Sequence, residues 1–204
     1  PNWFAPKGVA PKDKLGWGLP NWFEHVGDEH DTVRTKAGII DQTSFGKIEI
    51  KGPGSLQFLQ KIAANQMDKP VGSITYTQML NEKGGIECDL TVSRIGENHF
   101  YLVTGTAFVK HDLSWVQKHL PKYSSISVND VTSTKACITL CGPRSRHILK
   151  QLTKDDISNE GFPYMACKQI TIGHAPALAL RITFVGELGL ELHLPIEYAL
   201  NVYD

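Results

Sequence analysis

Polar and apolar residues alternate in the stretch Lys47-Ile48-Glu49-Ile50-Lys51, which runs directly into Gly52-Pro53. This alternation predicts a strand with one buried face, and the Gly-Pro pair predicts a tight turn at its end. From Ser55 to Ile62 the apolar residues recur at helical spacing. The stretch 47–62 therefore predicts a strand, a turn and a helix.

The same order of elements occurs a second time along the chain. A strand predicted over Ala136–Cys141 is followed by Gly142-Pro143 and by a helix predicted over Ser145–Leu152. An internal repeat of this kind indicates two related structural units.

Each copy continues with two strands joined by a turn and then with a helix. The predicted ranges, in chain order, are strands at Glu87–Ile95 and Phe100–Thr104, a helix at Lys110–His119, strands at Ala177–Val185 and Leu188–Leu194, and a helix at Ile196–Tyr203. Strands linked as hairpins favour an α+β fold with mixed or antiparallel sheets over a doubly wound parallel sheet.

The repeat also suggests how the chain is divided. Residues 1–35 are expected to form an irregular N-terminal arm and a first helix, predicted from Val26 to Ala37. Residues 36–125 are predicted to form the first subdomain and residues 126–204 the second, related one. The last helix is short, so the C-terminal part of the second unit is expected to be missing.

The charge balance limits the classes of partner. The 204 residues include 21 basic and 21 acidic side chains, and 41% are hydrophobic. A zero net charge gives no electrostatic reason to expect nucleic acid or an anionic membrane as a partner. No apolar run reaches the roughly 18 residues of a membrane-spanning helix.

The cysteines and histidines show no metal-binding spacing. The four cysteines form no C-x-x-C pair, and we expect them to be buried thiols. The eight histidines are scattered singly, so no metal site is predicted. Neither a phosphate-binding loop nor a Gly-x-Ser-x-Gly motif occurs.

Two acidic residues are candidates for a functional site. Asp89 lies in the apolar stretch Gly84–Val92, on the opposite strand face from Cys88 and Leu90. Because a buried carboxylate is costly without a partner, Asp89 either faces solvent or lines a ligand pocket. Glu191 follows the turn of the second hairpin, where it is either structural or an acceptor for the N–H groups of a planar heterocycle.

Three motifs, Gly38–Glu49, Met79–Val92 and Phe184–Glu191, follow one another in a familiar order. Together they resemble the aminomethyltransferase (glycine-cleavage T-protein) family, and most closely the folate domain of dimethylglycine and sarcosine dehydrogenases. The opening Pro1-Asn2-Trp3-Phe4 resembles the point where the flavin-bearing half of those enzymes joins the folate half.

The resemblance implies a folate-binding fold whose first two parts are related subdomains. It also implies a function, in which tetrahydrofolate captures the one-carbon unit of an oxidised N-methyl glycine (dimethylglycine or sarcosine) as 5,10-methylene-tetrahydrofolate. The implied cofactor of this chain is tetrahydrofolate, and FAD is expected on an upstream domain. The implied partners are folate, the iminium derived from the N-methyl glycine, and that flavin domain.

The resemblance assigns roles to four residues. Asp89 corresponds to the reactive-site acid, which lies near the folate nitrogens, away from water, and assists proton transfer. Glu191 corresponds to the acid that binds the pterin, Phe184 to the aromatic residue that covers it, and Phe45 to an apolar pocket position. At Gly105 the T-proteins carry an asparagine, which favours the dehydrogenase branch.

Two alternatives stay open. One is a non-catalytic regulatory relative similar to the regulatory subunit of pyruvate dehydrogenase phosphatase, which the run 195–200 resembles and which Glu191 disfavours. The other is a stand-alone glycine-cleavage aminomethyltransferase. The compartment is expected to be the cytoplasm for a bacterial protein and the mitochondrial matrix for a eukaryotic one.

Overall fold

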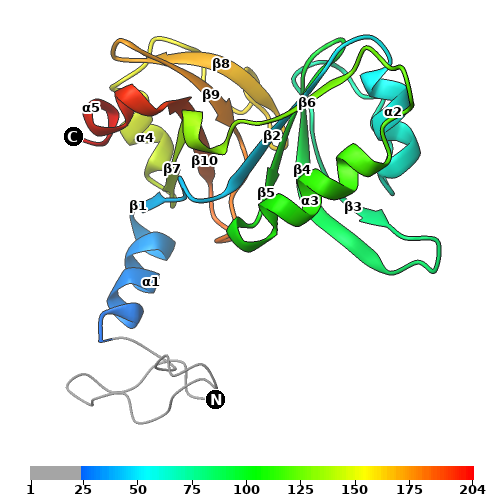
Figure 1. The fold of residues 1–204 in the computed structure, drawn as a ribbon. Helices are drawn as coiled ribbons and strands as arrows, with labels where there is room; N and C mark the ends of the chain where they lie inside the picture. Colours follow the sequence, from blue (N-terminus) through cyan, green and yellow to red (C-terminus); the bar gives the residue numbers. More distant parts are fainter. Residues whose placement is uncertain (1–23) are drawn as a thin grey trace.

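Two five-stranded antiparallel sheets pack against each other, and helices cover the outer face of each sheet (Figure 1). This computed structural model describes residues 24–204, so the predicted arm with its Pro-Asn-Trp-Phe motifs lies outside the described residues. The predicted α+β fold is confirmed, and every strand pair is antiparallel. Over the described range, no helix has the length and apolar character needed to cross a membrane.

The first sheet is formed largely by the first copy of the repeat. Its strands, in spatial order, are β3 (Ile74–Leu80), β4 (Ile86–Gly96), β5 (His99–Thr104), β2 (Gly46–Lys51) and β6 (Ser127–Asp130). Helices α2 (Ser55–Ile62) and α3 (Val109–Lys118) cover its outer face, and the short 3-10 helix η1 (Thr106–Phe108) precedes α3.

The second sheet repeats this arrangement. Its strands, in spatial order, are β8 (Cys167–Ile172), β9 (Ala175–Leu180), β10 (Gly189–Pro195), β7 (Lys135–Cys141) and β1 (Gly38–Asp41). Helices α4 (Ser145–Leu149) and α5 (Ala199–Tyr203) lie on its outer face. The remaining elements are α1 (Val26–Thr35), which leads into β1, and the 3-10 helices η2 (Thr132–Thr134) and η3 (Ile196–Tyr198).

The two copies of the repeat exchange their leading strands. β1 precedes the first copy but pairs with β7 of the second, and β6 precedes the second copy but pairs with β2 of the first. Each sheet therefore contains one edge strand from the other half of the chain, so the two halves are joined by backbone hydrogen bonds. Whether residues 36–125 and 126–204 behave as separate subdomains stays a prediction.

The core has three apolar layers. One lies between the first sheet and its helices, one between the second sheet and its helices, and one between the two sheets. The middle layer contains Tyr101 and Val103 of β5, which face Leu178 and Leu180 of β9. Side chains on the inner faces of β4, β5, β7 and β10 thus point toward the junction of the sheets.

Three predicted elements are shorter in the structure, and the first of them, the helix predicted from Val26 to Ala37, ends at Thr35. The strand predicted over Ala177–Val185 ends at Leu180, where its pairing with β10 also ends, and the next residue, Arg181, forms backbone bonds with Met165 and Ala166. Phe184 therefore lies in a loop. The helix predicted over Ser145–Leu152 ends at Leu149, where i→i+3 bonds tighten the last turn.

Both Gly-Pro elements are tight turns, as predicted. Gly52 and Gly142 occupy equivalent positions, with φ of 122° and 101°. A Cβ at Gly52 would lie 2.2 Å from the carbonyl oxygen of Ser125, and one at Gly142 would lie 2.7 Å from that of Lys36. Only glycine therefore fits at either turn.

Gly52→Ala is expected to lower the free energy of unfolding by about 2–4 kcal/mol, because backbone strain and overpacking act together. Gly173→Ala is the matched control, because Gly173 also has a positive φ but has no atom within 4 Å of the added Cβ. That variant should cost only about 1–2 kcal/mol. Urea unfolding measures both losses, and equal losses would contradict the steric explanation.

Candidate functional site

Asp89 lies in β4 on the face opposite the helices, directly across from Gln78 of β3. The Gln78 amide Nε2 donates a hydrogen bond to Asp89 Oδ1 at 2.8 Å. Hydrogen bonding to Asp89 also raises the pKa of Tyr76. Asp89 is exposed in this structure, so the expectation that its carboxylate is kept from water is not met by the described residues.

The apolar face predicted for this strand is mostly correct. Cys88, Leu90 and Val92 are buried under the helices, as expected. Ile86 is instead 66% exposed, because the pairing of β3 with β4 shifts between Met79 and Leu80 and Ile86 pairs with Leu80. An extra residue in one strand reverses the facing of the residues beyond it.

Glu191 is buried, whereas Asp89 is exposed. It lies in the middle of β10, between Thr139 of β7 and Leu180 of β9, and its side chain is only 3% exposed. The carboxylate oxygen Oε2 lies 3.3 Å from Nε2 of His193, which is also buried. A buried carboxylate needs hydrogen-bond donors, and Nε2 of His193 lies in position to supply one.

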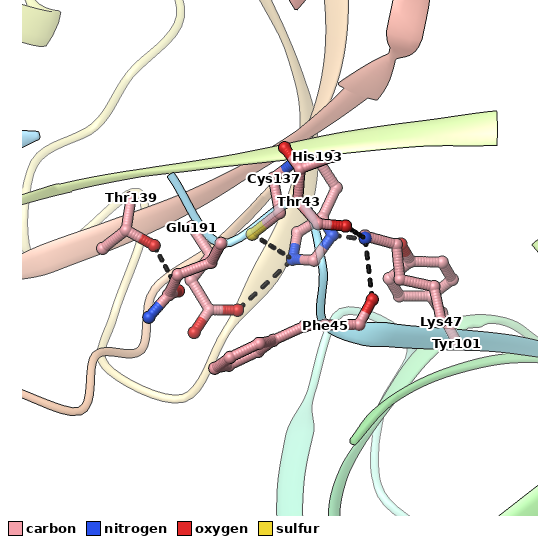
Figure 2. Close-up of polar contacts among 9 residues, drawn as sticks. Thr43, Phe45, Lys47, Tyr101, Cys137, Thr139, Glu191 and His193 are labelled. Carbon is pink, nitrogen blue, oxygen red and sulfur yellow. Dashed lines mark hydrogen bonds and ion pairs between the residues drawn. The ribbon is translucent and has the colours of Figure 1, made fainter. Parts of the chain in front are cut away.

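His193 connects Glu191 to the first sheet (Figure 2). Its Nδ1 lies 3.0 Å from the hydroxyl oxygen of Tyr101, and its Nε2 also lies 3.6 Å from Sγ of Cys137. Burial lowers the pKa of His193, so the ring is neutral and carries one proton. If Nε2–H donates to Glu191, Tyr101 O–H donates to Nδ1, and one directed chain of hydrogen bonds orients the carboxylate.

Phe45 is positioned by a buried lysine. Lys47 is fully buried, and its Nζ donates to the carbonyl oxygens of Thr43 at 2.8 Å and Phe45 at 2.9 Å (Figure 2). Burial lowers the pKa of Lys47. The loop is tied to the second sheet as well, since Thr139 donates to Gln42 at 2.5 Å.

The structure brings three of the four predicted site residues together. The rings of Phe45 and Phe184 meet edge to face, with centroids 5.8 Å apart, and Phe184 is 74% exposed. The Phe45 loop is bonded to Thr139, which is the cross-strand neighbour of Glu191. Among the described residues, no hydrogen bond or ion pair joins Asp89 to this group.

The sequence did not predict three of the residues that contact Glu191, His193 or the Phe45 loop, namely Lys47, Tyr101 and His193. Lys47 occupies a polar position of an alternating strand, which predicts a solvent-facing side chain. It is buried because that face of β2 meets the second sheet. One sequence feature could have revealed the buried contact to Glu191: His193 follows Glu191 by two residues, so the two side chains lie on the same face of the strand.

A cavity of about 850 Å³ lies beside α1 and β1, where Ile39, Asp41 and Val185 form part of its lining. None of the four predicted site residues lines it. Glu187, the other acid of the Phe184–Glu191 motif, is tied to α1 by an ion pair with Arg34 at 2.8 Å. This ion pair gives Glu187 a structural role.

The buried His193 predicts a pH dependence of stability. Its folded-state pKa lies below the ordinary value, so only the unfolded chain gains a proton as the pH falls below about 6.5. The stability that neutral His193 contributes is therefore present above about pH 6.5 and is lost below it, by at most about 1.4 kcal/mol per pH unit.

Urea unfolding between about pH 7 and pH 5 measures this effect when the wild type is compared with His193→Gln. The difference in stability between the two proteins should shrink toward acid pH, because glutamine does not titrate. A difference that stays constant over this range would contradict the assignment of His193 as buried and neutral.

Comparison with known proteins identifies the family. The GCVT N-terminal domain family matches residues 1–204. The mitochondrial pyruvate dehydrogenase phosphatase regulatory subunit of Mus musculus is 35% identical over the whole chain, and the mitochondrial dimethylglycine dehydrogenase of Homo sapiens is 33% identical over the whole chain. An aminomethyltransferase of Bacillus licheniformis is 36% identical over 92% of the chain.

A solved structure supports the same fold. Glycine cleavage system aminomethyltransferase T from Bartonella henselae has a TM-score of 0.76, with 24% identity over 86% of this chain and 46% of its own. The chain spans 24% of the phosphatase subunit and of the dehydrogenase, and 51% of the Bacillus aminomethyltransferase. The fold and the family resemblance are confirmed: the chain belongs to the GCVT N-terminal domain family and is related to aminomethyltransferases and dimethylglycine dehydrogenases.

Proposed function

We propose that this chain is the tetrahydrofolate-binding domain of an enzyme that captures the one-carbon unit of an oxidised N-methyl glycine as 5,10-methylene-tetrahydrofolate. The observation that carries the proposal is the buried Glu191 carboxylate, oriented by a hydrogen-bond chain from Tyr101 through His193. Tetrahydrofolate supplies, when bound, a nucleophilic amine for an electrophilic carbon.

The residues fit such a ligand in two ways. Glu191 offers a carboxylate to the N–H groups of a planar ring, which carboxylates accept in pairs. Phe45 and Phe184 offer an edge-to-face pair of aromatic rings, of which Phe184 is largely exposed. Aromatic surfaces that are free to cover a flat heterocycle supply apolar contact without a hydrogen-bond requirement.

Asp89 is proposed as the group that moves a proton during the transfer. An exposed carboxylate fixed by Gln78 is accessible to a ligand and is a group of the kind that can accept a proton. The partners of this function are folate, the iminium of dimethylglycine or sarcosine, and an FAD-bearing domain upstream. The compartment is proposed to be the cytoplasm in a bacterium and the mitochondrial matrix in a eukaryote.

The test uses the native polypeptide, including any residues that flank these 204. Dimethylglycine or sarcosine is supplied with tetrahydrofolate and a formaldehyde trap, because free formaldehyde condenses with tetrahydrofolate without an enzyme. Mass spectrometry is expected to detect 5,10-methylene-tetrahydrofolate. Oxidation of the amine with all of the carbon recovered in the trap would contradict the proposal.

A second candidate is a non-catalytic regulatory role, favoured by the 35% identity to the phosphatase regulatory subunit. In that case the Glu191 network would be structural. Binding of a phosphatase catalytic subunit, without oxidation of any N-methyl glycine, is the result that would favour this role.

A further inference from the structure

A second cluster of reactive side chains lies on the outer face of the first sheet. Cys88 of β4 and Asp112 of α3 are each 1% exposed, and His111 precedes Asp112 in the same helix. One ligand atom from each residue lies within 4.8 Å of the other two. These residues are separate from the Glu191 network, because Cys88 lies in the apolar layer under the helices of the first sheet, whereas the network of Tyr101, His193 and Glu191 lies between the two sheets.

We propose that Cys88, His111 and Asp112 form a binding site for a divalent cation of the zinc class. Thiolate, imidazole and carboxylate are the three ligand types that zinc accepts. At zinc–ligand distances of about 2.0–2.3 Å, tetrahedral ligand atoms lie about 3.5 Å apart. In this structure the three ligand atoms lie within 4.8 Å of one another, so a bound ion would draw them closer together, and His111 is the half-exposed side chain of the three.

The hydrogen-bond partners of the proposed ligands resemble those that orient the ligands of known metal sites. Nδ1 of His111 faces Asp112 Oδ1 at 3.0 Å, while its Nε2 faces Glu87 Oε2 at 3.4 Å. Glu87 is itself fixed by Asn81, which donates to Oε1 at 2.8 Å. A carboxylate behind the second ring nitrogen is the usual way in which a metal-binding histidine is oriented.

A neighbouring side chain also orients Asp112. Thr104 donates to its Oδ2 at 2.5 Å, which leaves Oδ1 directed toward His111. The two carboxylates of the cluster, Glu87 and Asp112, form no ion pair with a lysine or arginine within residues 24–204. Their ion-pair partner is the single imidazole of His111, so two carboxylates against one imidazole leave the local charge negative, and a cation is the complementary ligand.

A second group of possible metal ligands, formed by Cys137, Glu191 and His193, is a poorer candidate for a cation site. All three residues are buried, and Glu191 is the group proposed above to bind tetrahydrofolate. Lys47 is close enough to interact electrostatically with both Cys137 and Glu191. A fixed positive charge opposes a cation, whereas His111 leaves the Cys88 cluster open to solvent.

The test is titration of the full chain with Zn²⁺ against a chromophoric chelator, followed by the visible spectrum of the Co²⁺ form. One equivalent is expected to bind, with a cysteine-to-cobalt charge-transfer band. Cys88→Ser and His111→Gln should each weaken binding at least about 10-fold, and Glu87→Gln should weaken it about 10- to 100-fold.

Cys137→Ser is the matched control, because it removes another buried thiol from outside the cluster and should leave the affinity unchanged. Circular dichroism of each variant reports whether the fold is retained. The proposal is overturned if folded Cys88→Ser and His111→Gln bind Zn²⁺ as the wild type does, if Cys137→Ser alone abolishes binding, or if no stoichiometric binding occurs.

Discussion

Exchange of Asp89 for asparagine is expected to slow one-carbon capture by about 10²–10⁴-fold, the contribution typical of a positioned general acid or base. Asparagine has nearly the same size, and its carbonyl oxygen can still accept the hydrogen bond from Gln78. It cannot take up a proton. Because Asp89 is exposed, stability should change by no more than about 0.5 kcal/mol.

The measurement is the rate of methylene-tetrahydrofolate formation at saturating tetrahydrofolate. Asp68→Asn is a suitable control, since Asp68 is an exposed acid paired with Arg94 outside the proposed site. The control should keep the wild-type rate. A wild-type rate in Asp89→Asn would show that Asp89 has no role in proton transfer.

Glu191→Gln is expected to weaken tetrahydrofolate binding by about 10- to 100-fold, because hydrogen bonds to a charged group contribute about 1.5–3 kcal/mol. The amide keeps the shape of the side chain but removes its charge and half of its acceptor capacity. The effect should appear in affinity and to a smaller degree in the rate at saturation. Calorimetric titration measures the affinity, and the rate assay described for Asp89 separates the two effects.

Glu187→Gln provides the matched control for this change. Glu187 belongs to the same motif, but its carboxylate pairs with Arg34 of α1 and does not take part in the His193 network. Its exchange should leave the affinity for tetrahydrofolate within about twofold, as for a surface change. An equal loss in both variants would mean that charge near the loop, and not the carboxylate of Glu191, governs binding.

The central strands could be predicted from sequence, and the edge strands could not. β2, β4, β5, β7, β9 and β10 have alternating or continuous apolar patterns because they pair on both sides and cover a core. The four edge strands, β1, β3, β6 and β8, are missing from the prediction. An edge strand pairs on one side only, so its sequence is less constrained. The exchange of β1 and β6 between the halves has no local signal at all.

For the candidate site, motifs predicted the residues but not their environments. The internal repeat placed Asp89 and Glu191 in corresponding hairpins of the two copies, whereas Asp89 is exposed and Glu191 is buried. Glu191 also lies on β10, the counterpart of β5, whereas Asp89 lies on β4. Burial depends on which strand faces meet between the sheets, and the partners Tyr101 and His193 are 92 residues apart in sequence. Only the folded chain shows that contact.

The most direct test of the proposed function is calorimetric titration of tetrahydrofolate into the native polypeptide, with wild type, Glu191→Gln and Glu187→Gln compared under identical conditions. We expect one site per chain, an affinity reduced about 10- to 100-fold in Glu191→Gln, and no change beyond about twofold in Glu187→Gln. Absence of tetrahydrofolate binding in the wild type, or wild-type affinity in Glu191→Gln, would contradict the proposal that this domain binds folate through Glu191.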